Sequence, residues 1–501
     1  MKYCYIVKES SEIPLKSHRT RPRFEKRLLN NIEYALKKEG ILDYDITMKE
    51  GVITIKSSDD KVGNVVRNVF GVHKVCKALC MEFHSINDIV SKAEEIFKNH
   101  VVGKKFAVRV KRAGTHSFTS LDIAAKVGEA LLKYSAGVNL SNPDVIINIE
   151  VRDNVVYYIL KCWDGVKGLP VGIEGRVLSL FSGGYDSTLA SWLAGKRGCE
   201  VDFLHFFMGS KDVTIQAFLI AKELTKWFSP YEPKIIIVDI TPLLSEIRVK
   251  VRNDYSQVVL RWYMYYIAQR LSSLHNYDAI VTGESVGQAS SQTLKNLSVI
   301  EGSLELNAKR PIIRPLAFMD KEEIIEKIRS LGLYEITSKV KEVCRLAIGP
   351  VTTRAHMKIL MNEVRKISKE LIDVLLNTRI TVSIKDTEPN TLSKLLDEFV
   401  LNVEVDAEKA VRMIKEGAVL IDARDLKDYK AWHLSNAIHV SELHKMLKEG
   451  IDFSKSYVIY CDYGTLSLAY AKMLRRFGIN AFSVKGGVNK LKELLRTSDK
   501  S

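Results

Sequence analysis

The chain has 501 residues, enough for several domains that each bury a core of their own. Hydrophobic residues make up 46% and charged residues 27%, which is typical of globular proteins, and no apolar run reaches the length of a membrane span. The start of the chain lacks the apolar core of a signal peptide, so we expect a cytoplasmic protein without membrane association. The net charge of +15 favours a polyanionic partner, although thermophilic proteins can be rich in lysine for other reasons.

The first third of the chain alternates strand and helix patterns and carries more than half of the excess positive charge. Residues 1–170 hold 28 Lys and Arg against 20 Asp and Glu, a distribution expected of a nucleic-acid-binding end. Elements are expected at residues 3–7 (strand), 23–38 (basic amphipathic helix), 51–55 (strand) and 62–69 (helix). This order predicts a small ferredoxin-like α+β unit, to which we assign residues 1–57.

A second unit is expected at residues 58–165. Helices are predicted at 86–100 and 120–134, the latter beginning with a Ser cap, and strands at 105–110, 145–151 and 155–160, the last two forming a hairpin. Residues 109–118, which begin at the end of the first of these strands, hold three cations, a histidine and an aromatic residue. Such a run suits phosphate contact with base stacking, or is a solvated basic edge strand. We name as candidate RNA contacts Arg109, Lys111, Arg112 and His116.

A glycine turn at residues 182–187 carries the clearest chemical signal. It follows an apolar strand at 177–181 and precedes a helix, so its glycines let backbone N–H groups approach an anion at the helix start. No Lys follows the second glycine, which excludes the common P-loop. Asp186 orients the loop or meets a Mg²⁺ ion, because its charge makes it a poor phosphate ligand. The run SGGYDS resembles the PP-loop of ATP pyrophosphatases, the alternative being an ordinary serine–glycine turn.

The same region predicts a doubly wound parallel sheet within a domain at residues 172–395, after a Gly/Pro-rich linker at 165–172. Strands at 201–207, 234–238 and 278–283 alternate with helices. Ligands bind at the carboxyl ends of the strands in such sheets. The residues that fall at such ends are Leu180, Phe181, His205, Phe206 and Gly283.

A further α/β unit is expected at residues 404–501. Cys461 ends its strand at 457–460 and stands before a helix at 468–477, where backbone N–H groups stabilise a thiolate or a persulfide anion. The alternative is an inert buried cysteine. Four segments in order resemble a rhodanese domain: 420–424, 432–438, Cys461 and 484–488. Asp462 stands where thiosulfate-using rhodaneses carry basic residues, which favours a protein persulfide as the sulfur donor.

The seven cysteines are odd in number and scattered, so we predict no disulfide framework and expect most of them to be small buried side chains. Cys76 and Cys80 have helical spacing but no second pair to complete a metal site. We therefore name no metal-ligand cluster.

Together these segments resemble the tRNA 4-thiouridine synthetase (tRNA uridine 4-sulfurtransferase) family over essentially the whole chain. Matching stretches are 12–25, 70–72, 112–116 (in a region that looks like a THUMP domain), 168–172, 281–293, 314–316 and 320–325. The resemblance implies a multidomain α/β fold. Its parts are an N-terminal ferredoxin-like unit, a THUMP RNA-binding unit, a doubly wound PP-loop domain and a rhodanese domain.

The resemblance also implies a reaction. ATP and Mg²⁺ bind at the PP-loop, and O4 of the uridine at position eight of a tRNA attacks the α-phosphate. A cysteine desulfurase places sulfur on Cys461, and this persulfide, or sulfide derived from it, displaces AMP. Cys344 then resolves the Cys461 persulfide as a disulfide, which an external thiol or electron carrier reduces. The implied nucleotide-binding residues are Leu180, Phe181, Ser182, Gly183, Gly184, Asp186, Ser187, His205, Phe206, Arg261, Gly283 and Gln292.

Other functions stay open at this stage. Family members can also pass sulfur through a sulfur-carrier protein toward the thiazole of thiamin, and the rhodanese unit suffices for that. A tRNA-binding protein with inactive loops is disfavoured by the intact PP-loop and Cys461, and a PP-loop amidotransferase by the lack of a glutaminase-like segment. The sequence does not identify the sulfur donor, the reductant or the oligomeric state, for which a homodimer is one candidate.

Overall fold

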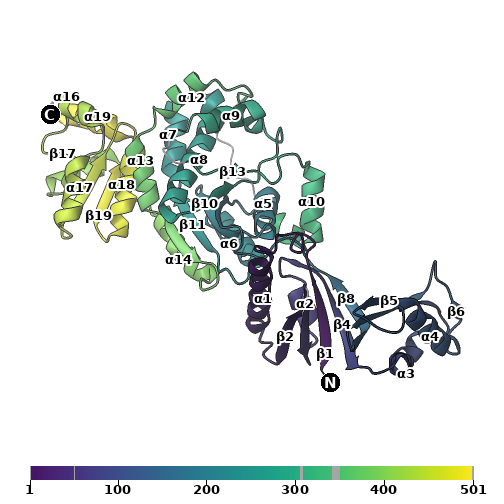
Figure 1. Cartoon of the computed structure of the whole chain (residues 1–501). Coiled ribbons are helices and arrows are strands. Elements are labelled where there is room, and N and C mark those ends of the chain that lie inside the picture. Colours follow the sequence, from purple (N-terminus) through teal and green to yellow (C-terminus); the bar gives the residue numbers. More distant parts are fainter. Residues whose placement is uncertain (1, 50, 305–308, 341–349, 499–501) are drawn as a thin grey trace. The chain divides into compact units, whose positions relative to one another are not determined.

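The computed structural model describes residues 2–49, 51–304, 309–340 and 350–498. The chain divides into two compact units (Figure 1). Unit 1 comprises Met1–Glu174, Gly195–Cys199 and Lys226–Tyr231, and unit 2 comprises Gly175–Ala194, Glu200–Thr225 and Glu232–Ser501. No helix in the described part of the chain is long and apolar enough to cross a membrane.

Unit 1 is built on one eight-stranded sheet of order β2-β3-β1-β4-β8-β7-β5-β6. Its strands are β1 (Tyr3–Glu9), β2 (Tyr44–Lys49), β3 (Val52–Ser57), β4 (Val72–Glu82), β5 (Lys105–Ala113), β6 (Gly137–Val138), β7 (Val145–Arg152) and β8 (Val155–Asp164). Its helices are α1 (Arg21–Lys38), α2 (Val62–Val66), α3 (Ile86–Phe97), the 3₁₀ helix η1 (Lys98–His100) and α4 (Ser120–Leu132). The expected hairpin is confirmed, because β7 and β8 pair antiparallel.

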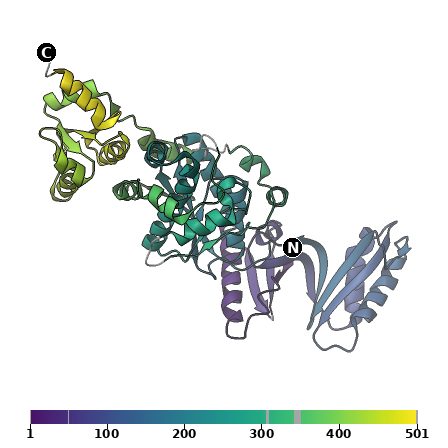
Figure 2. The same ribbon diagram turned by 90° about the horizontal axis from the view of Figure 1, so that it is seen from above.

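The long strand β4 joins the two halves of this sheet. It pairs antiparallel with β1 on one side and with β8 on the other. Helix α1 lies along the first half, and α3 and α4 lie along the second (Figures 1 and 2). Val62, Val66 and Val75, which follow the boundary expected at residue 57, pack in the same core as Tyr5.

The predicted Ser cap of α4 is wrong by one position. The helix begins at Ser120, but the cap is Thr119, whose side chain accepts a hydrogen bond from the backbone N–H of Asp122. Asp122 in turn accepts from Thr119 N, which completes a capping box. Both Thr and Ser are favoured N-cap residues, so residue type alone does not decide between these neighbours, and the extended backbone of Thr119 identifies it as the cap.

Two disulfides overturn the prediction that the cysteines form none. Cys4 is bonded to Cys80, and Cys76 to Cys162. The sequence does not show these pairs because they are 76 and 86 residues apart and depend on strand register. Cys76 lies directly opposite Cys162 in the β4–β8 pair, and Cys4 on β1 lies opposite Ala78, two positions from Cys80.

The first sheet of unit 2 has the order β13-β12-β9-β10-β11-β14. The strands are β9 (Arg176–Leu180), β10 (Glu200–Phe207), β11 (Lys234–Asp239), β12 (Ala279–Val281), β13 (Ile312–Ile313) and β14 (Ile380–Ser383). The first five pair in parallel, which confirms the doubly wound sheet, and β14 adds an antiparallel edge. The chain moves outward from β9 to β10 and β11, then crosses to β12 on the other side. The switch point at which ligands bind thus lies between β9 and β12.

Helices surround this sheet. They are α5 (Tyr185–Lys196), α6 (Lys211–Leu224), α7 (Thr241–Lys250), η2 (Asn253–Tyr255), α8 (Ser256–His275), η3 (Ser290–Gln292), α9 (Leu294–Gly302), α10 (Lys321–Ser330), α11 (Tyr334–Thr337), α12 (Met357–Val364), α13 (Lys369–Asn377) and α14 (Pro389–Val400). The strands that they cover are apolar on both faces, as parallel strands in such sheets are, and Leu178, Leu204 and Ile280 are fully buried.

The second sheet of unit 2 is entirely parallel, with the order β15-β19-β18-β16-β17. Its strands are β15 (Glu404–Val405), β16 (Val419–Asp422), β17 (Ile438–His439), β18 (Ser456–Tyr460) and β19 (Asn480–Val484). Its helices are α15 (Ala407–Lys415), α16 (Leu426–Ala431), α17 (Val440–Glu449), α18 (Thr465–Arg476) and α19 (Gly487–Ser498). Cys461 follows the buried strand β18, as the sequence predicts.

Candidate active site

The PP-loop forms a tight turn between β9 and α5. Gly183 has a φ of +83°, and a Cβ there would lie 2.9 Å from Ala217 Cα, so only glycine fits. Ser182 and Ser187 close the turn, with their hydroxyl oxygens 3.1 Å apart, and the backbone N–H of Ser182 donates to Ser187 Oγ at 3.2 Å. The N-terminus of α5 follows directly, which makes this end of the sheet an anion-binding position.

Gly283 forms the opposite wall, at the end of β12. A Cβ there would lie 2.6 Å from both Ser187 N and Asp186 C, so the two backbones approach as closely as glycine permits. The structure thereby brings Gly283 and the PP-loop together at the switch point between β9 and β12. That the two bind one ligand stays a prediction.

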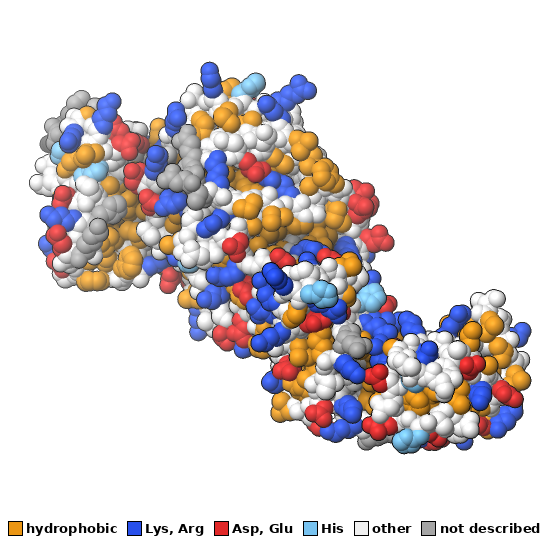
Figure 3. Space-filling model, viewed as in Figure 1, with side chains coloured by type: hydrophobic (Ala, Val, Ile, Leu, Met, Phe, Trp, Pro, Cys, Tyr) orange, Lys and Arg blue, Asp and Glu red, His pale blue; other side chains and the backbone are white. Residues whose placement is uncertain are grey.

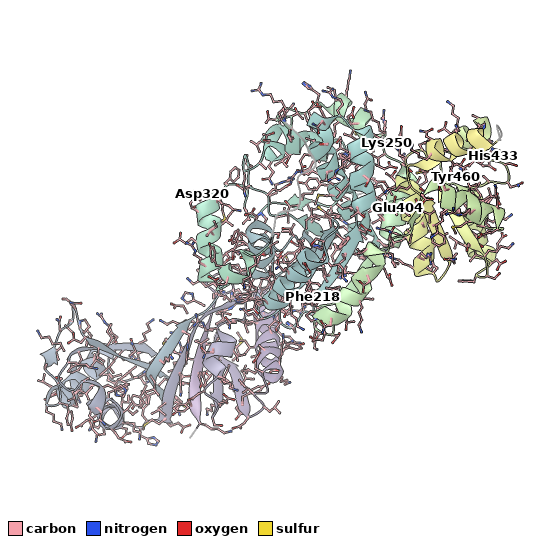
Figure 4. The ribbon with its side chains drawn as sticks, turned by 180° about the vertical axis from the view of Figure 1, so that it is seen from behind. Phe218, Lys250, Asp320, Glu404, His433 and Tyr460 are labelled. Carbon is pink, nitrogen blue, oxygen red and sulfur yellow. A yellow bond between two sulfur atoms is a disulfide. The ribbon has the colours of Figure 1, made fainter. Side chains whose placement is uncertain are left out.

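Asp186 is held by two side chains from distant segments. Lys321 Nζ donates to its two carboxylate oxygens at 3.0 and 3.3 Å, and Gln288 Nε2 donates to Oδ2 at 3.0 Å. Lys321 opens α10, directly after Asp320 (labelled in Figure 4), which caps that helix by accepting from Glu323 N. Sequence reasoning did not name Lys321 as a site residue, although it lies in the matched segment 320–325.

Arg261 reaches the same region from α8. Its guanidinium is bonded to the Glu284 carboxylate and donates to Ser291 Oγ at 3.2 Å. Ser291 adjoins Gln292, the other expected nucleotide contact. Arg261 Nε and Gln292 Oε1 are both buried, and neither has a hydrogen-bond partner among the described residues. A buried donor and a buried acceptor without partners suit a polar ligand, because leaving such groups unpaired costs free energy.

The His205 side chain is enclosed by the protein. Its Nδ1 lies 2.9 Å from the carbonyl oxygen of Phe181 and its Nε2 lies 3.0 Å from Thr214 Oγ1. Burial lowers the pKa of His205 to about 4, so the ring is neutral at pH 7. Phe181 and Phe206 are also buried. These side chains support the strand ends, and contact between a nucleotide and this segment stays a prediction.

Cys461 lies in a cradle of backbone donors. Its Sγ accepts from Gly464 N at 3.2 Å and from Ser467 N at 3.5 Å, at the start of α18. Its backbone oxygen accepts from Val488 N at 2.8 Å. Helix α18 begins at Thr465, three residues earlier than expected, and this places the N–H groups of its first turn against the sulfur. Tyr460, labelled in Figure 4, marks the end of the preceding strand.

The expected RNA contacts lie on β5 and the loop after it. Arg109, Lys111 and Arg112 are exposed, and Arg112 Nη1 lies 2.9 Å from Nδ1 of His116. The His116 ring stacks on Phe118, with 5.1 Å between ring centroids. Phe118 lines a hollow of about 570 Å³ together with His84 and Lys126. Arg112 thus lies beside a stacked aromatic pair, while Arg109 and Lys111 are on the other face of β5.

Sequence reasoning missed a second basic hollow in unit 1. It has a volume of about 430 Å³ and is lined by Arg23, Lys26, Arg27, Asn30, Gly172 and Ile173. Arg23 and Arg27 donate to the backbone oxygens of Ile173 and Gly172, at 3.2 and 3.0 Å. Figure 3 shows Lys and Arg side chains on this unit. The sequence does indicate a basic helix at 23–38. It does not show which of its cations line a hollow, because the hollow forms only where the linker residues Gly172 and Ile173 fold against α1.

Cys344 lies at 341–349, outside the described residues. Among the residues that the structure describes, no group of three or more His, Cys, Asp and Glu side chains is arranged to hold a metal ion.

The sequence matches four protein families, which follow one another along the chain. These are "ThiI ferredoxin-like domain" at residues 5–76, "THUMP domain" at 83–160, "Thiamine biosynthesis protein (ThiI)" at 172–370 and "Rhodanese-like domain" at 406–494. The THUMP, PP-loop and rhodanese assignments made from the sequence are thereby confirmed.

Curated relatives match most of the chain. A tRNA sulfurtransferase of Desulfurococcus amylolyticus is 39% identical, covering 97% of both chains, and one of Pyrobaculum aerophilum is 33% identical, covering 96% of both. The crystal structure of a 4-thiouridine synthetase–RNA complex with bound ATP is similar with a TM-score of 0.66 and 28% identity, covering 76% of this chain and 99% of that one. The chain therefore belongs to the tRNA sulfurtransferase family.

Proposed function

We propose that this protein is an ATP-dependent tRNA uridine 4-sulfurtransferase that forms 4-thiouridine at position eight. The observation that carries the proposal is the presence in one chain of two complementary sites. One is the PP-loop with Gly283 packed against it and with Arg261 bonded to Glu284, the residue after Gly283. The other is the Cys461 thiol in its backbone cradle. The names of the relatives and the ATP and RNA in the similar crystal structure support it.

The PP-loop site activates the uridine. Backbone N–H groups at the start of α5 bind the phosphates of ATP, and O4 of the uridine attacks the α-phosphate, so that pyrophosphate leaves and O4 carries AMP. Lys321 neutralises Asp186 in the free protein and is close enough to the loop to pair with phosphate oxygens instead. Asp186 fits a Mg²⁺ ion, which in proteins takes one or two carboxylates together with substrate phosphates. Mg²⁺ bound there would neutralise charge that develops on the phosphates.

The Cys461 site supplies the sulfur. A cysteine desulfurase transfers sulfur to Cys461, and the two N–H groups that face Sγ favour the persulfide anion. The terminal sulfur attacks C4 and AMP leaves with the former O4. Cys344 then attacks the Sγ of Cys461, which releases the sulfur on C4 and leaves a Cys344–Cys461 disulfide. An external thiol or electron carrier supplies the two electrons that reduce it.

Unit 1 binds the tRNA in this proposal. Exposed Arg109, Lys111 and Arg112 contact phosphates, and the His116–Phe118 pair offers a surface on which a base stacks. The hollow beside Arg23, Lys26 and Arg27 gives further cations, and backbone oxygens hold the guanidiniums of Arg23 and Arg27 in place. Phosphate contacts of this kind orient an RNA without reading its sequence.

Nucleoside mass spectrometry tests the proposal. The protein is incubated with an unmodified tRNA transcript, ATP, Mg²⁺, a reductant, and a cysteine desulfurase with cysteine. We expect 4-thiouridine in the digested tRNA, no product when ATP is omitted, and no product in a transcript with cytidine at position eight. Absence of 4-thiouridine from the complete reaction, with ATP and tRNA binding intact, would contradict the proposal.

A further inference from the structure

Glu284 is a buried carboxylate that no step above uses. It follows Gly283 at the end of β12, and its side chain is only 6% exposed. Two guanidiniums meet it, because Arg261 is bonded to Oε1 and Arg314 Nε donates to Oε2 at 2.8 Å. The hydroxyl of Tyr265 is also bonded to Oε2, and Thr282 Oγ1 donates to the same oxygen at 3.0 Å. All four partners satisfy the charged form.

The carboxylate stays ionised in this setting. Burial alone would raise the pKa of Glu284, but the charges of Arg261 and Arg314 hold it below its usual range. Removing one partner of such a buried ion pair leaves the other charge uncompensated, which is strongly destabilising. A network of this kind therefore has few alternative arrangements, and the guanidinium of Arg261 is fixed by it.

The position of this network suits a role in nucleotide binding. Gly283, the residue before Glu284, packs against the backbone of Asp186 and Ser187. On the other side Arg261 also donates to Ser291, next to Gln292. Two buried atoms lack partners among the described residues: Arg261 Nε and Gln292 Oε1. The network holds the Arg261 side chain directly, and Gln292 is the residue after Ser291, to which Arg261 donates.

We propose that Glu284 is a positioning residue for the adenine nucleotide. It holds the Arg261 guanidinium in one orientation, so that Arg261 Nε can donate a hydrogen bond to the bound nucleotide and Gln292 Oε1 can accept one from it. Glu284 does not itself contact the reacting atoms. The proposal rests on the function proposed above and names how that site is preorganised. A merely structural ion pair is the competing explanation.

The test is Glu284→Gln, which keeps the side-chain volume but removes the charge that two guanidiniums need. We expect the KM for ATP to rise at least tenfold while the KM for tRNA is unchanged. We also expect Arg261→Lys to raise the KM for ATP, and the double variant to be no worse than Arg261→Lys alone, because Glu284 acts through Arg261. Tyr265→Phe removes one hydroxyl from Glu284 and should raise the KM for ATP more mildly, which keeps the test available if Glu284→Gln folds poorly.

The matched control is Glu363→Gln. Glu363 on α12 is also buried in unit 2, and its carboxylate accepts from Arg252 N and Lys366. We expect it to lower the melting temperature without changing the KM for ATP. The inference is overturned if Glu284→Gln or Tyr265→Phe changes only the melting temperature, or if the effects of Glu284→Gln and Arg261→Lys on ATP affinity are additive. Failure of the wild type to form 4-thiouridine would instead count against the proposed function.

Discussion

The imidazole of His205 lies inside unit 2, between the carbonyl oxygen of Phe181 and Thr214 Oγ1. Burial makes the charged ring costly there and sets its pKa at about 4, whereas a histidine in the unfolded chain titrates near pH 6.5. Between these two values the unfolded state binds a proton that the folded state does not. The free energy of unfolding therefore falls as the pH is lowered from about 6.5 to about 4, and His205 adds no further loss below that.

We predict that His205→Gln removes this part of the pH dependence. In the wild type His205 contributes a slope of up to about 1.4 kcal/mol per pH unit over that range. The measurement is denaturant unfolding of both proteins from pH 4 to pH 8. Comparison with the variant is needed because Glu9 in unit 1, whose pKa burial raises to about 7, contributes with the opposite sign. If the free energy of unfolding depends on pH in the same way in both proteins, His205 is not a buried, neutral side chain and the prediction is wrong.

At the scale of elements, β4 holds the sheet of unit 1 together through covalent bonds as well as its ladders. Each disulfide links β4 to a neighbour, β1 through Cys4–Cys80 and β8 through Cys76–Cys162. A disulfide that closes a loop of this length restricts the unfolded chain, and chain-entropy estimates give about 4 kcal/mol for each.

We predict that Cys76→Ser with Cys162→Ser lowers the melting temperature of unit 1 by about 10 °C or more, because roughly 4 kcal/mol is lost from a domain of this size. Calorimetry under non-reducing conditions measures it. Cys199→Ser is the matched control, since Cys199 takes part in neither disulfide, and should cost much less. An unchanged melting temperature in the double variant would contradict this prediction, and so would detection of Cys4, Cys76, Cys80 and Cys162 as free thiols in the native wild type.

The elements also show what a sequence can reveal about this site. The PP-loop and the Cys461 cradle are each one continuous segment between a strand and a helix, so a few consecutive residues suffice to predict their chemistry. Lys321 and Glu284 act through partners 135 and 23 residues away, Asp186 and Arg261, and only the folded sheet brings these together. The disulfides cannot be predicted from the sequence for the same reason: which cysteines pair depends on the register between strands that are distant in the chain.

At the scale of the whole molecule, the proposed reaction assigns activation and sulfur insertion to different sheets of one chain. The PP-loop lies at the carboxyl ends of β9 and β12, and Cys461 lies at the carboxyl end of β18. Each site has its own backbone cradle, so a change at one leaves the donors of the other in place. In the proposed mechanism, ATP-dependent adenylation of the tRNA does not require the sulfur-carrying thiol.

Single-turnover reactions with α-labelled ATP test this claim most directly, using Cys461→Ser and Asp186→Ala side by side. Label transfer to tRNA reports adenylation, and nucleoside mass spectrometry reports 4-thiouridine. The account predicts that Cys461→Ser adenylates the tRNA but forms no 4-thiouridine, and that Asp186→Ala does neither. Wild-type yields of 4-thiouridine over many turnovers from Cys461→Ser, or an unchanged rate of adenylation in Asp186→Ala, would contradict it.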